Sequence, residues 1–89
     1  MIEKIWLVTQ ESNVDGEIWF NVVPCASKDT AKEIMDKKIQ TLMNDGHYTD
    51  YKEWPNDFIL EKSEDSYYIE DTCDDYYEDI RIEEKEIQF

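Results

Sequence analysis

Glycine and proline are scarce in this chain, with only two of each among its 89 residues. Low-complexity segments are usually rich in these residues, so the composition argues against such a segment. No run of about 18 apolar residues is present, although a membrane-spanning helix needs one, so no membrane partner is expected. The N-terminus has neither the basic start nor the apolar stretch of a secretion signal, which predicts a cytoplasmic location.

Cysteine and histidine are also rare, and their positions argue against cysteine chemistry. Cys25 and Cys73 are 48 residues apart, a spacing that matches no metal-ligand motif. Without a secretion signal, we expect both to be free thiols. The single histidine, His47, and Cys25 flank opposite ends of an expected helix, which places them about 25 Å apart at 1.5 Å per residue. A cysteine nucleophile needs a base within hydrogen-bond reach, so this pair predicts no catalysis.

No arrangement of residues in the sequence is typical of a phosphate, metal or glycosidase site. The two glycines lie far apart, which excludes a Gly-rich phosphate loop. Residues 13–17 are similar to half of a calcium loop but lack its bidentate glutamate, and Asp71, Asp74 and Asp75 can gather a cation only loosely. Paired carboxylates are abundant, but a small core leaves little room for a catalytic cleft. We therefore expect no metal, no cofactor and no catalytic residue, and hence no enzyme.

Positive charge is in short supply. Nine lysines and arginines stand against 23 aspartates and glutamates, which gives a net charge of −14. Residues 61–89 carry 12 acids and three bases, whereas residues 1–60 carry 11 acids and six bases. Such a chain repels nucleic acid and anionic membranes, because phosphate contacts need a basic surface. If electrostatics select the partner, we expect a basic protein surface and no direct nucleic-acid binding.

The abundance of apolar and aromatic residues predicts one folded domain. Apolar residues make up 40% of the chain and aromatic residues 13%, which is too many for a disordered acidic tail. A chain of this length supports one modest core, so we expect a single acidic domain spanning residues 1–89.

Alternating residues at the start of the chain predict a β-hairpin. Its two strands, residues 2–8 and 17–23, alternate with period two and are rich in β-branched and aromatic residues. Between them lies a polar stretch that ends in Asp15 and Gly16, a pair that tolerates the positive φ angles of a tight turn. Pro24 is expected to end the second strand, because proline cannot donate a hydrogen bond to a ladder.

A change to three- and four-residue spacing predicts one helix after residue 27. Ser27 can cap its start, and Asp29 suits the first turn. Gly46 suits a left-handed position after its end, and lysines and acids occupy its polar face. The apolar stripe that we expect to face the core consists of Ala31, Ile34, Met35, Ile39, Leu42 and Met43.

The rest of the chain predicts three further strands. Residues 47–56 are expected to form a connection, with Tyr48, Tyr51 and Trp54 folded back as a lid over one end of the core. The strands are expected over residues 57–62, 67–70 and 76–87. The predicted fold class is therefore α+β, with one helix packed on an antiparallel sheet in the order ββαβββ. The sheet face away from the helix is left to water, and we expect it to carry the acids.

Tyrosines lie between carboxylates in the acidic segment from Glu61 to Glu86. Tyrosine supplies contact area at low entropic cost and is enriched at interfaces. We therefore expect a docking face for a basic partner, and its most specific form is a nucleic-acid mimic that occupies a channel built for phosphates. The residues expected to contact the partner are Tyr67, Glu70, Asp74, Asp75, Tyr77, Asp79 and Glu83.

Other interpretations of the acidic segment stay open from the sequence alone. The acids can serve only solubility, since a high net charge keeps small domains soluble and monomeric. They can also form a weak divalent-cation site. The sequence does not fix the oligomeric state, so dimerisation through an exposed strand edge or the aromatics around Trp54 is open as well.

Several short stretches carry a resemblance to known proteins. They are Lys4-Ile5-Trp6-Leu7-Val8-Thr9, Asp15-Gly16, Val22-Val23-Pro24-Cys25, Ala31-Lys32-Glu33 and a closing Tyr-Tyr-x-Asp-Ile-x-Ile-Glu-Glu-Lys-Glu. Over nearly its whole length the chain resembles small acidic proteins of gut bacteria and of their phages or mobile elements. The resemblance carries no known activity and assigns no functional residue. It implies an accessory or inhibitory role, such as that of an anti-restriction or anti-CRISPR factor.

Overall fold

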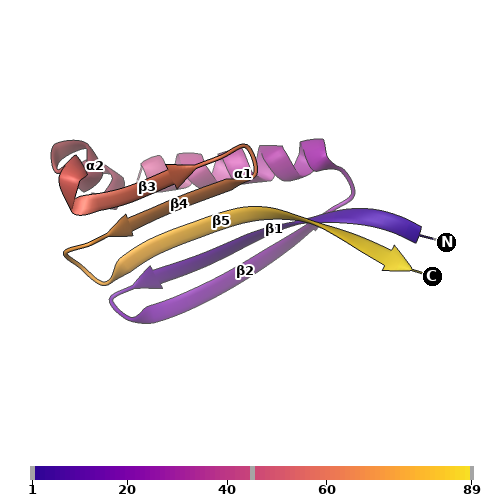
Figure 1. Ribbon diagram of the computed structural model, residues 1–89, viewed down its shortest axis with the longest axis horizontal. Helices are drawn as coiled ribbons and strands as arrows, with labels where there is room; N and C mark the ends of the chain where they lie inside the picture. The colour runs from indigo at the N-terminus through magenta and orange to yellow at the C-terminus, as the bar shows by residue number, and fades with distance from the viewer. Residues whose placement is uncertain (1, 45, 89) are drawn as a thin grey trace.

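Two 13-residue strands, β1 (Ile2–Val14) and β5 (Tyr76–Gln88), pair antiparallel along their whole lengths. They form the centre of a five-stranded antiparallel sheet with the order β2-β1-β5-β4-β3 (Figure 1). The other elements are β2 (Glu17–Cys25), α1 (Lys28–Met43), α2 (Gly46–Glu53), the 3₁₀ helix η1 (Pro55–Asp57), β3 (Phe58–Lys62) and β4 (Ser66–Asp71).

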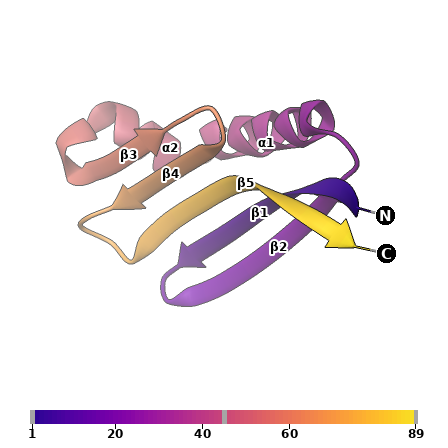
Figure 2. The same cartoon turned by 45° about the vertical axis from the view of Figure 1, so that its right-hand side comes forward.

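The computed structural model describes residues 2–44 and 46–88, with side chains for residues 3–44 and 50–88. Helix α1 lies against one face of the sheet, where it contacts β1, β2 and β5 (Figures 1 and 2). This arrangement confirms the predicted α+β class, with one main helix on an antiparallel sheet. The order differs from ββαβββ, because α2 and η1 follow α1 before the last three strands.

The β1–β2 hairpin turns at Asp15 and Gly16, whose φ angles are 54° and 88°. Two positive φ values match a two-residue type I′ turn, which the Asp-Gly pair predicts. Both strands are longer than predicted, because β1 continues to Val14 and β2 to Cys25. The prediction that Pro24 ends the strand is therefore wrong. β2 is an edge strand, and Pro24 occupies a position whose N–H would point away from the sheet. Its missing N–H therefore breaks no ladder hydrogen bond.

Helix α1 begins where the sequence predicts. The Ser27 hydroxyl accepts a hydrogen bond from the Thr30 N–H at 3.1 Å, which satisfies a backbone donor that helix geometry leaves free. Ala31, Met35 and Ile39 are buried, and this confirms the centre of the predicted apolar stripe. The remaining stripe residues are partly buried at the edge of the core: Ile34, Leu42 and Met43.

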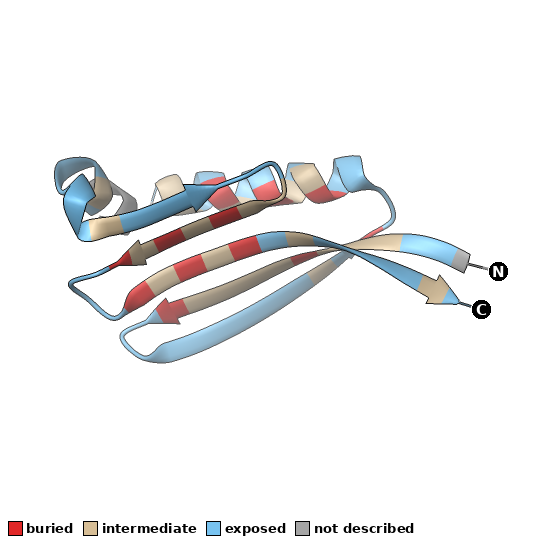
Figure 3. Ribbon diagram, viewed as in Figure 1, coloured by how far each residue is buried: buried red, intermediate tan, exposed pale blue. Residues whose placement is uncertain are grey.

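One apolar core lies between α1 and the sheet (Figure 3). Residues of β4 and of the first half of β5 alternate between buried and less buried positions, as the two-residue period of a strand requires. On the helix side, Tyr67, Ile69 and Ile80 are almost fully buried, and Val8 of β1 joins them. The long central strands therefore contribute one face to the core and leave the other face available.

Residues 47–56 do not form the simple connection that the sequence predicts, because they contain most of α2 and all but the last residue of η1. They carry no apolar stripe at helical spacing, so their pattern does not reveal a helix. The predicted aromatic lid forms only in part. Tyr51 packs edge-on against Phe58, with ring centroids 5.8 Å apart, whereas Trp54 is 63% exposed. The side chain of Tyr48 lies outside the described residues.

Beyond the core, the ends of β1 and β5 continue as a two-stranded ribbon (Figure 2). β2 pairs with β1 only from Trp6 onward, and β4 pairs with β5 only as far as Arg81. The molecule consequently measures 50 Å along its longest axis and 23 and 17 Å across it. Within the described parts of the chain, no helix has both the length and the apolar character needed to cross a bilayer.

Candidate functional site

The sheet face turned away from α1 is the candidate site, and the strand period decides which side chains it carries. In β5, Glu78 and Ile80 are buried on the helix side, so Tyr77 and Asp79 point the other way. Directly paired residues of antiparallel strands share a face, so the register extends this assignment to all five strands. We call this surface the open face, and its central side chains are Thr9, Glu11, Ile18, Phe20, Val22, Ile59, Glu61, Ser66, Tyr68, Glu70, Tyr77, Asp79, Arg81 and Glu83.

Three carboxylates and a tyrosine form a row across four strands of the open face. Glu11 on β1 is paired with Asp79 on β5. Asp79 is paired in turn with Tyr68 on β4, which is paired with Glu61 on β3. Neighbouring strands lie about 4.8 Å apart, so the row spans three such steps. We call these four residues the acidic row, and the fold assembles it from three distant parts of the sequence.

Two tyrosine hydroxyls hold carboxylates of the open face in place. Tyr77 donates a hydrogen bond to Glu11 Oε2 at 2.7 Å. Tyr68 donates one to Glu70 Oε1 at 2.9 Å. The two tyrosine rings stack, with centroids 6.3 Å apart and planes inclined by 25°. Both carboxylates are therefore held in place by rigid aromatic side chains.

These surroundings raise the pKa of both tyrosines. Burial raises the pKa of Tyr68 to about 12, and the hydrogen bond to Glu70 adds to the effect. For Tyr77, the hydrogen bond to Glu11 is the main cause of the raised pKa, followed by burial. Both hydroxyls are therefore protonated at neutral pH and act as hydrogen-bond donors.

Arg81 is the base that lies among these carboxylates. Its Nε donates a hydrogen bond to Asp79 Oδ1 at 2.9 Å, and its side chain is 60% exposed. An ion pair this exposed contributes little to stability, because water screens it. Glu83 lies further along β5, where Lys85 Nζ approaches its carboxylate at 3.7 Å. The open face thus keeps a strong excess of negative charge.

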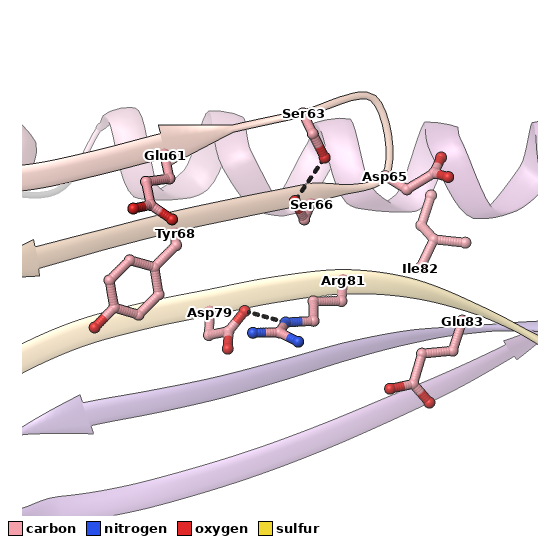
Figure 4. A pocket seen from close by; sticks show the side chains of 9 residues that line it. All are labelled: Glu61, Ser63, Asp65, Ser66, Tyr68, Asp79, Arg81, Ile82 and Glu83. Atoms are coloured by element: carbon pink, nitrogen blue, oxygen red, sulfur yellow. Dashed lines mark hydrogen bonds and ion pairs between the residues drawn. The ribbon is translucent and has the colours of Figure 1, made fainter.

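A shallow groove of about 650 Å³ follows the open face where β4 begins beside β5 (Figure 4). In this view, the side chains of Tyr68, Asp79 and Arg81 lie along β4 and β5 on the same side of the sheet. The groove is lined by Glu61, Ser63, Asp65, Ser66, Tyr68, Asp79, Arg81, Ile82 and Glu83. Four carboxylates and an aromatic ring suit a lysine or arginine side chain, since cations are attracted to both.

The structure brings four of the seven predicted contact residues onto the open face: Glu70, Tyr77, Asp79 and Glu83. Tyr67 does not belong to this set. It is 2% exposed and packs in the core, because the two-residue period places it on the same face as buried Ile69. Asp74 and Asp75 lie in the β4–β5 turn at the end of the sheet, where Asp75 Oδ1 accepts a 2.6 Å hydrogen bond from Asn13 Nδ2.

Helix α1 binds two further acids of the last third of the chain. Lys32 forms an ion pair with Glu64 in the β3–β4 turn, and this hydrogen bond lowers the pKa of Glu64. Lys28 Nζ lies 3.9 Å from Asp65 Oδ1 in the same turn. The acids of residues 61–89 therefore divide between the open face, the helix and the turns, instead of sharing one surface.

A buried glutamate faces the helix side of the sheet. Glu78 accepts hydrogen bonds from Gln10 Nε2 at 3.0 Å and from Ser12 Oγ at 2.5 Å. Lys38 Nζ of α1 donates to Gln10 Oε1 and to Asn21 Oδ1, each at 3.2 Å. The polar residues of β1 thus satisfy a buried carboxylate and connect it to the helix, as buried polar groups require.

Sequence reasoning misses three members of the acidic row: Glu11, Glu61 and Tyr68. Glu11 falls in the polar stretch that the sequence predicts as a turn, and no hydrophobic alternation reveals that the strand continues. Tyr68 and Glu61 lie within predicted strands. Tyr68 shares the two-residue period of Glu70, so that period indicates Tyr68 in place of Tyr67.

Possible metal ligands do not cluster in the part of the chain that the structure describes. No three His, Cys, Asp or Glu side chains among these residues lie close enough together to hold a metal ion. Cys25 is buried and Cys73 is exposed, and both are free thiols.

Comparison of the chain with protein-family models, with curated proteins and with solved structures gave no match. The geometry and charge of the open face are therefore the observations that bear on function.

Proposed function

We propose that this protein is a non-enzymatic interaction module whose open face docks onto a basic surface of a partner protein. The observation that carries the proposal is the acidic row, which aligns Glu11, Asp79 and Glu61 across four strands beside Tyr68. A sheet holds such a row rigidly, so little ordering is required when a partner binds. Complementary charge then speeds association and disfavours acidic partners.

The charge balance of the open face supports a basic partner. The single base among its central side chains is Arg81, and its carboxylates are Glu11, Glu61, Glu70, Asp79 and Glu83. Tyr68 and Tyr77 add flat, rigid contact area between these charges. The groove beside Tyr68 offers a place where one cationic side chain of the partner can be held.

The most specific form of this proposal is a nucleic-acid mimic that inhibits a nucleic-acid-binding protein of a host. Glu11 and Asp79 are paired on adjacent strands, which lie about 4.8 Å apart, and Asp79 and Glu83 lie four residues apart on β5, a separation of about 13 Å. A channel that binds phosphates attracts negative charge held in fixed positions. Occupancy of the channel by the open face would exclude nucleic acid, in keeping with the anti-restriction or anti-CRISPR role that the family resemblance implies.

Capture from a bacterial lysate tests mimicry. The immobilised chain is exposed to lysate at about 0.05 M and about 0.5 M salt, because contacts to phosphate-binding surfaces weaken steeply over this range. We expect to recover a nucleic-acid-binding protein at low salt only, and we expect duplex DNA to compete with the chain for it. Binding that survives high salt, or that DNA leaves unchanged, would contradict mimicry.

A charge-matched pair of variants separates docking from net charge. The docking variant neutralises the acidic row by Glu11→Gln, Glu61→Gln and Asp79→Asn. The control variant removes the same charge from exposed acids of the helices, by Glu33→Gln, Asp36→Asn and Glu53→Gln. We expect the docking variant to lose at least tenfold in affinity and the control to keep most of it, a difference of about 1.4 kcal/mol per tenfold change.

The alternative that the open face serves only solubility has one observation in its favour. Glu11, Glu70 and Asp79 each already accept a hydrogen bond from a side chain of the same face. On this alternative the docking and control variants behave alike in capture and lose solubility alike.

A weak divalent-cation site is the other alternative. Titration calorimetry with calcium and magnesium tests this alternative directly. Cation binding to the native state would also raise the melting temperature.

A further inference from the structure

The outer edge of β2 carries a row of large, exposed apolar side chains. Ile18, Trp19 and Phe20 are 63, 66 and 65% exposed, and Val22 is 41% exposed. By the register, Trp19 lies on the helix side of the sheet and the other three lie on the open face. Soluble proteins usually protect long edge strands with charge, proline or a covering segment, because an unprotected edge pairs with other strands.

The hairpin register shows which backbone groups of β2 point away from the sheet. Val14 and Glu17 flank a two-residue turn, so they form a hydrogen-bonded pair, and such pairs recur at every second residue. Every second residue from Glu17 onward therefore bonds to β1. The residues whose N–H and C=O groups point outward instead are Ile18, Phe20 and Val22.

β2 differs from β3, which is the strand at the other edge of the sheet. β3 has five residues, and two of them, Glu61 and Lys62, are charged. β2 has nine residues, and its single charged residue, Glu17, lies next to the turn. β2 is thus the edge whose length and apolar character suit the addition of a strand.

We propose that β2 pairs antiparallel with β2 of a second copy of this chain, with Phe20 opposite Phe20 and Ile18 opposite Val22. In this register the outward N–H and C=O groups of these residues all meet partner groups. A shift of two residues would set Ile18 opposite Pro24, which has no N–H to donate. The apolar side chains of both copies then form one continuous stripe on the open face.

The distribution of charge favours a second copy over a basic partner at this edge. A basic strand would meet only one acid on β2, Glu17, whereas a second copy sets Glu17 opposite Val23. The acids that approach each other on the open face are the two copies of Glu11, which three strand spacings separate by about 14 Å. This distance exceeds the screening length of about 8 Å at physiological salt, so their repulsion is weak there.

The dimer would extend the acidic row without covering it. Phe20 is paired with Glu11 in the β1–β2 ladder, so the rows of the two copies become collinear through the Phe20 pair. A two-fold axis normal to the sheet keeps both helices on one side and both open faces on the other. The inference rests on β2 alone, and it holds or fails independently of the proposed docking function.

Sedimentation equilibrium of the full chain tests the dimer directly. We expect a species of twice the 10.7 kDa chain mass, and tighter association at about 0.5 M salt than at about 0.02 M, because salt screens the repulsion between the copies. Docking to a basic partner has the opposite salt dependence, so the two proposals can fail separately. A chain that is monomeric at millimolar concentration in high salt would overturn the dimer.

Three single substitutions locate the interface. Phe20→Glu introduces facing charges at the two-fold axis, and we expect it to weaken dimerisation at least tenfold. Ile59→Glu on the other edge strand and Trp54→Glu just before η1 change other exposed apolar residues, and we expect both variants to dimerise like the parent chain. Equal weakening by all three would overturn the assignment to β2.

Hydrogen exchange of the unsubstituted chain avoids any effect of mutation on folding. In the monomer, the inward amides of Trp19 and Asn21 are protected by β1, whereas the outward amides of Ile18, Phe20 and Val22 exchange freely. We expect the outward amides to gain at least tenfold protection as the protein concentration rises through the dimerisation range. Outward amides whose exchange is independent of concentration would contradict pairing at this edge.

Discussion

The hydroxyl of Tyr77 in β5 donates a 2.7 Å hydrogen bond to Glu11 in β1, and it thereby joins residues 66 positions apart in the sequence. The bond links two side chains of the open face and fixes the carboxylate at the β1 end of the acidic row. A tyrosine from the acidic last third thus positions an acid from the first strand, so the same contact supports the fold and the docking surface that we propose.

Loss of the Tyr77 hydroxyl should weaken both folding and docking. Tyr77→Phe removes the donor to Glu11, and we expect the free energy of unfolding to fall by about 0.5–1 kcal/mol, since a partly exposed hydrogen bond is worth little more. A double-mutant cycle with Glu11→Ala, which removes the acceptor, isolates this contact when measured by urea unfolding. Fully additive effects of the two substitutions would show that the bond contributes nothing.

Alkaline pH should destabilise the protein through the open-face tyrosines. The pKa of Tyr68 is raised to about 12 in the folded state, against about 10 for an unperturbed tyrosine. The unfolded chain therefore binds fewer protons than the folded one between these values. The resulting stability is fully present below pH 10 and is lost as the pH rises through about 12. Ultraviolet titration of tyrosinate should show a late-titrating group that disappears in Tyr68→Phe.

The buried carboxylate on the helix side should be sensitive to truncation. Glu78→Ala leaves Gln10 and Ser12 without their acceptor, and we expect a loss of about 1–3 kcal/mol in the free energy of unfolding. Glu78→Gln keeps an acceptor oxygen in the same place and should cost less. Thermal unfolding of both variants compares them, and an alanine variant as stable as the glutamine variant would disagree with this network.

Helix orientation can be tested with neighbouring substitutions in α1. Ile39 is buried against the sheet and Gln40 is exposed. Ile39→Asp places an unpaired charge in the core, and we expect at least about 4 kcal/mol of destabilisation, enough to unfold much of the population. Gln40→Asp should change stability by about 0.5 kcal/mol or less. Circular dichroism on melting distinguishes the two, and similar melting curves would mean that α1 presents another face.

The apolar stripe of α1 and the Asp15-Gly16 turn could be predicted from the sequence because each depends on local chemistry. The full length of β1 could not. Its second half turns Gln10 and Ser12 toward the helix side, where they bind Glu78, so the usual contrast between apolar core positions and polar surface positions disappears. Pairing with a distant strand extends β1, and local propensity does not express that pairing.

The candidate site shows the same limit. Tyr67 and Tyr68 are adjacent and identical, so hydrophobicity alone does not tell which of them faces the core. Tyr67 and Ile69 are both buried in the core on one face of β4, which leaves Tyr68 on the open face. The sequence therefore predicts the acidic strands, but the expected contact residue Tyr67 is wrong, and Glu11 cannot be aligned with Asp79 without the register.

Chemical-shift mapping by nuclear magnetic resonance tests the docking claim most directly. An arginine-rich peptide serves as the basic probe, titrated into the isotope-labelled chain at low salt. If the open face docks basic partners, the largest shifts will fall on the acidic row, at Glu11, Glu61, Tyr68 and Asp79, and added salt will reverse them. Shifts centred on the β4–β5 turn or on the exposed acids of α1, with the row unaffected, would contradict it.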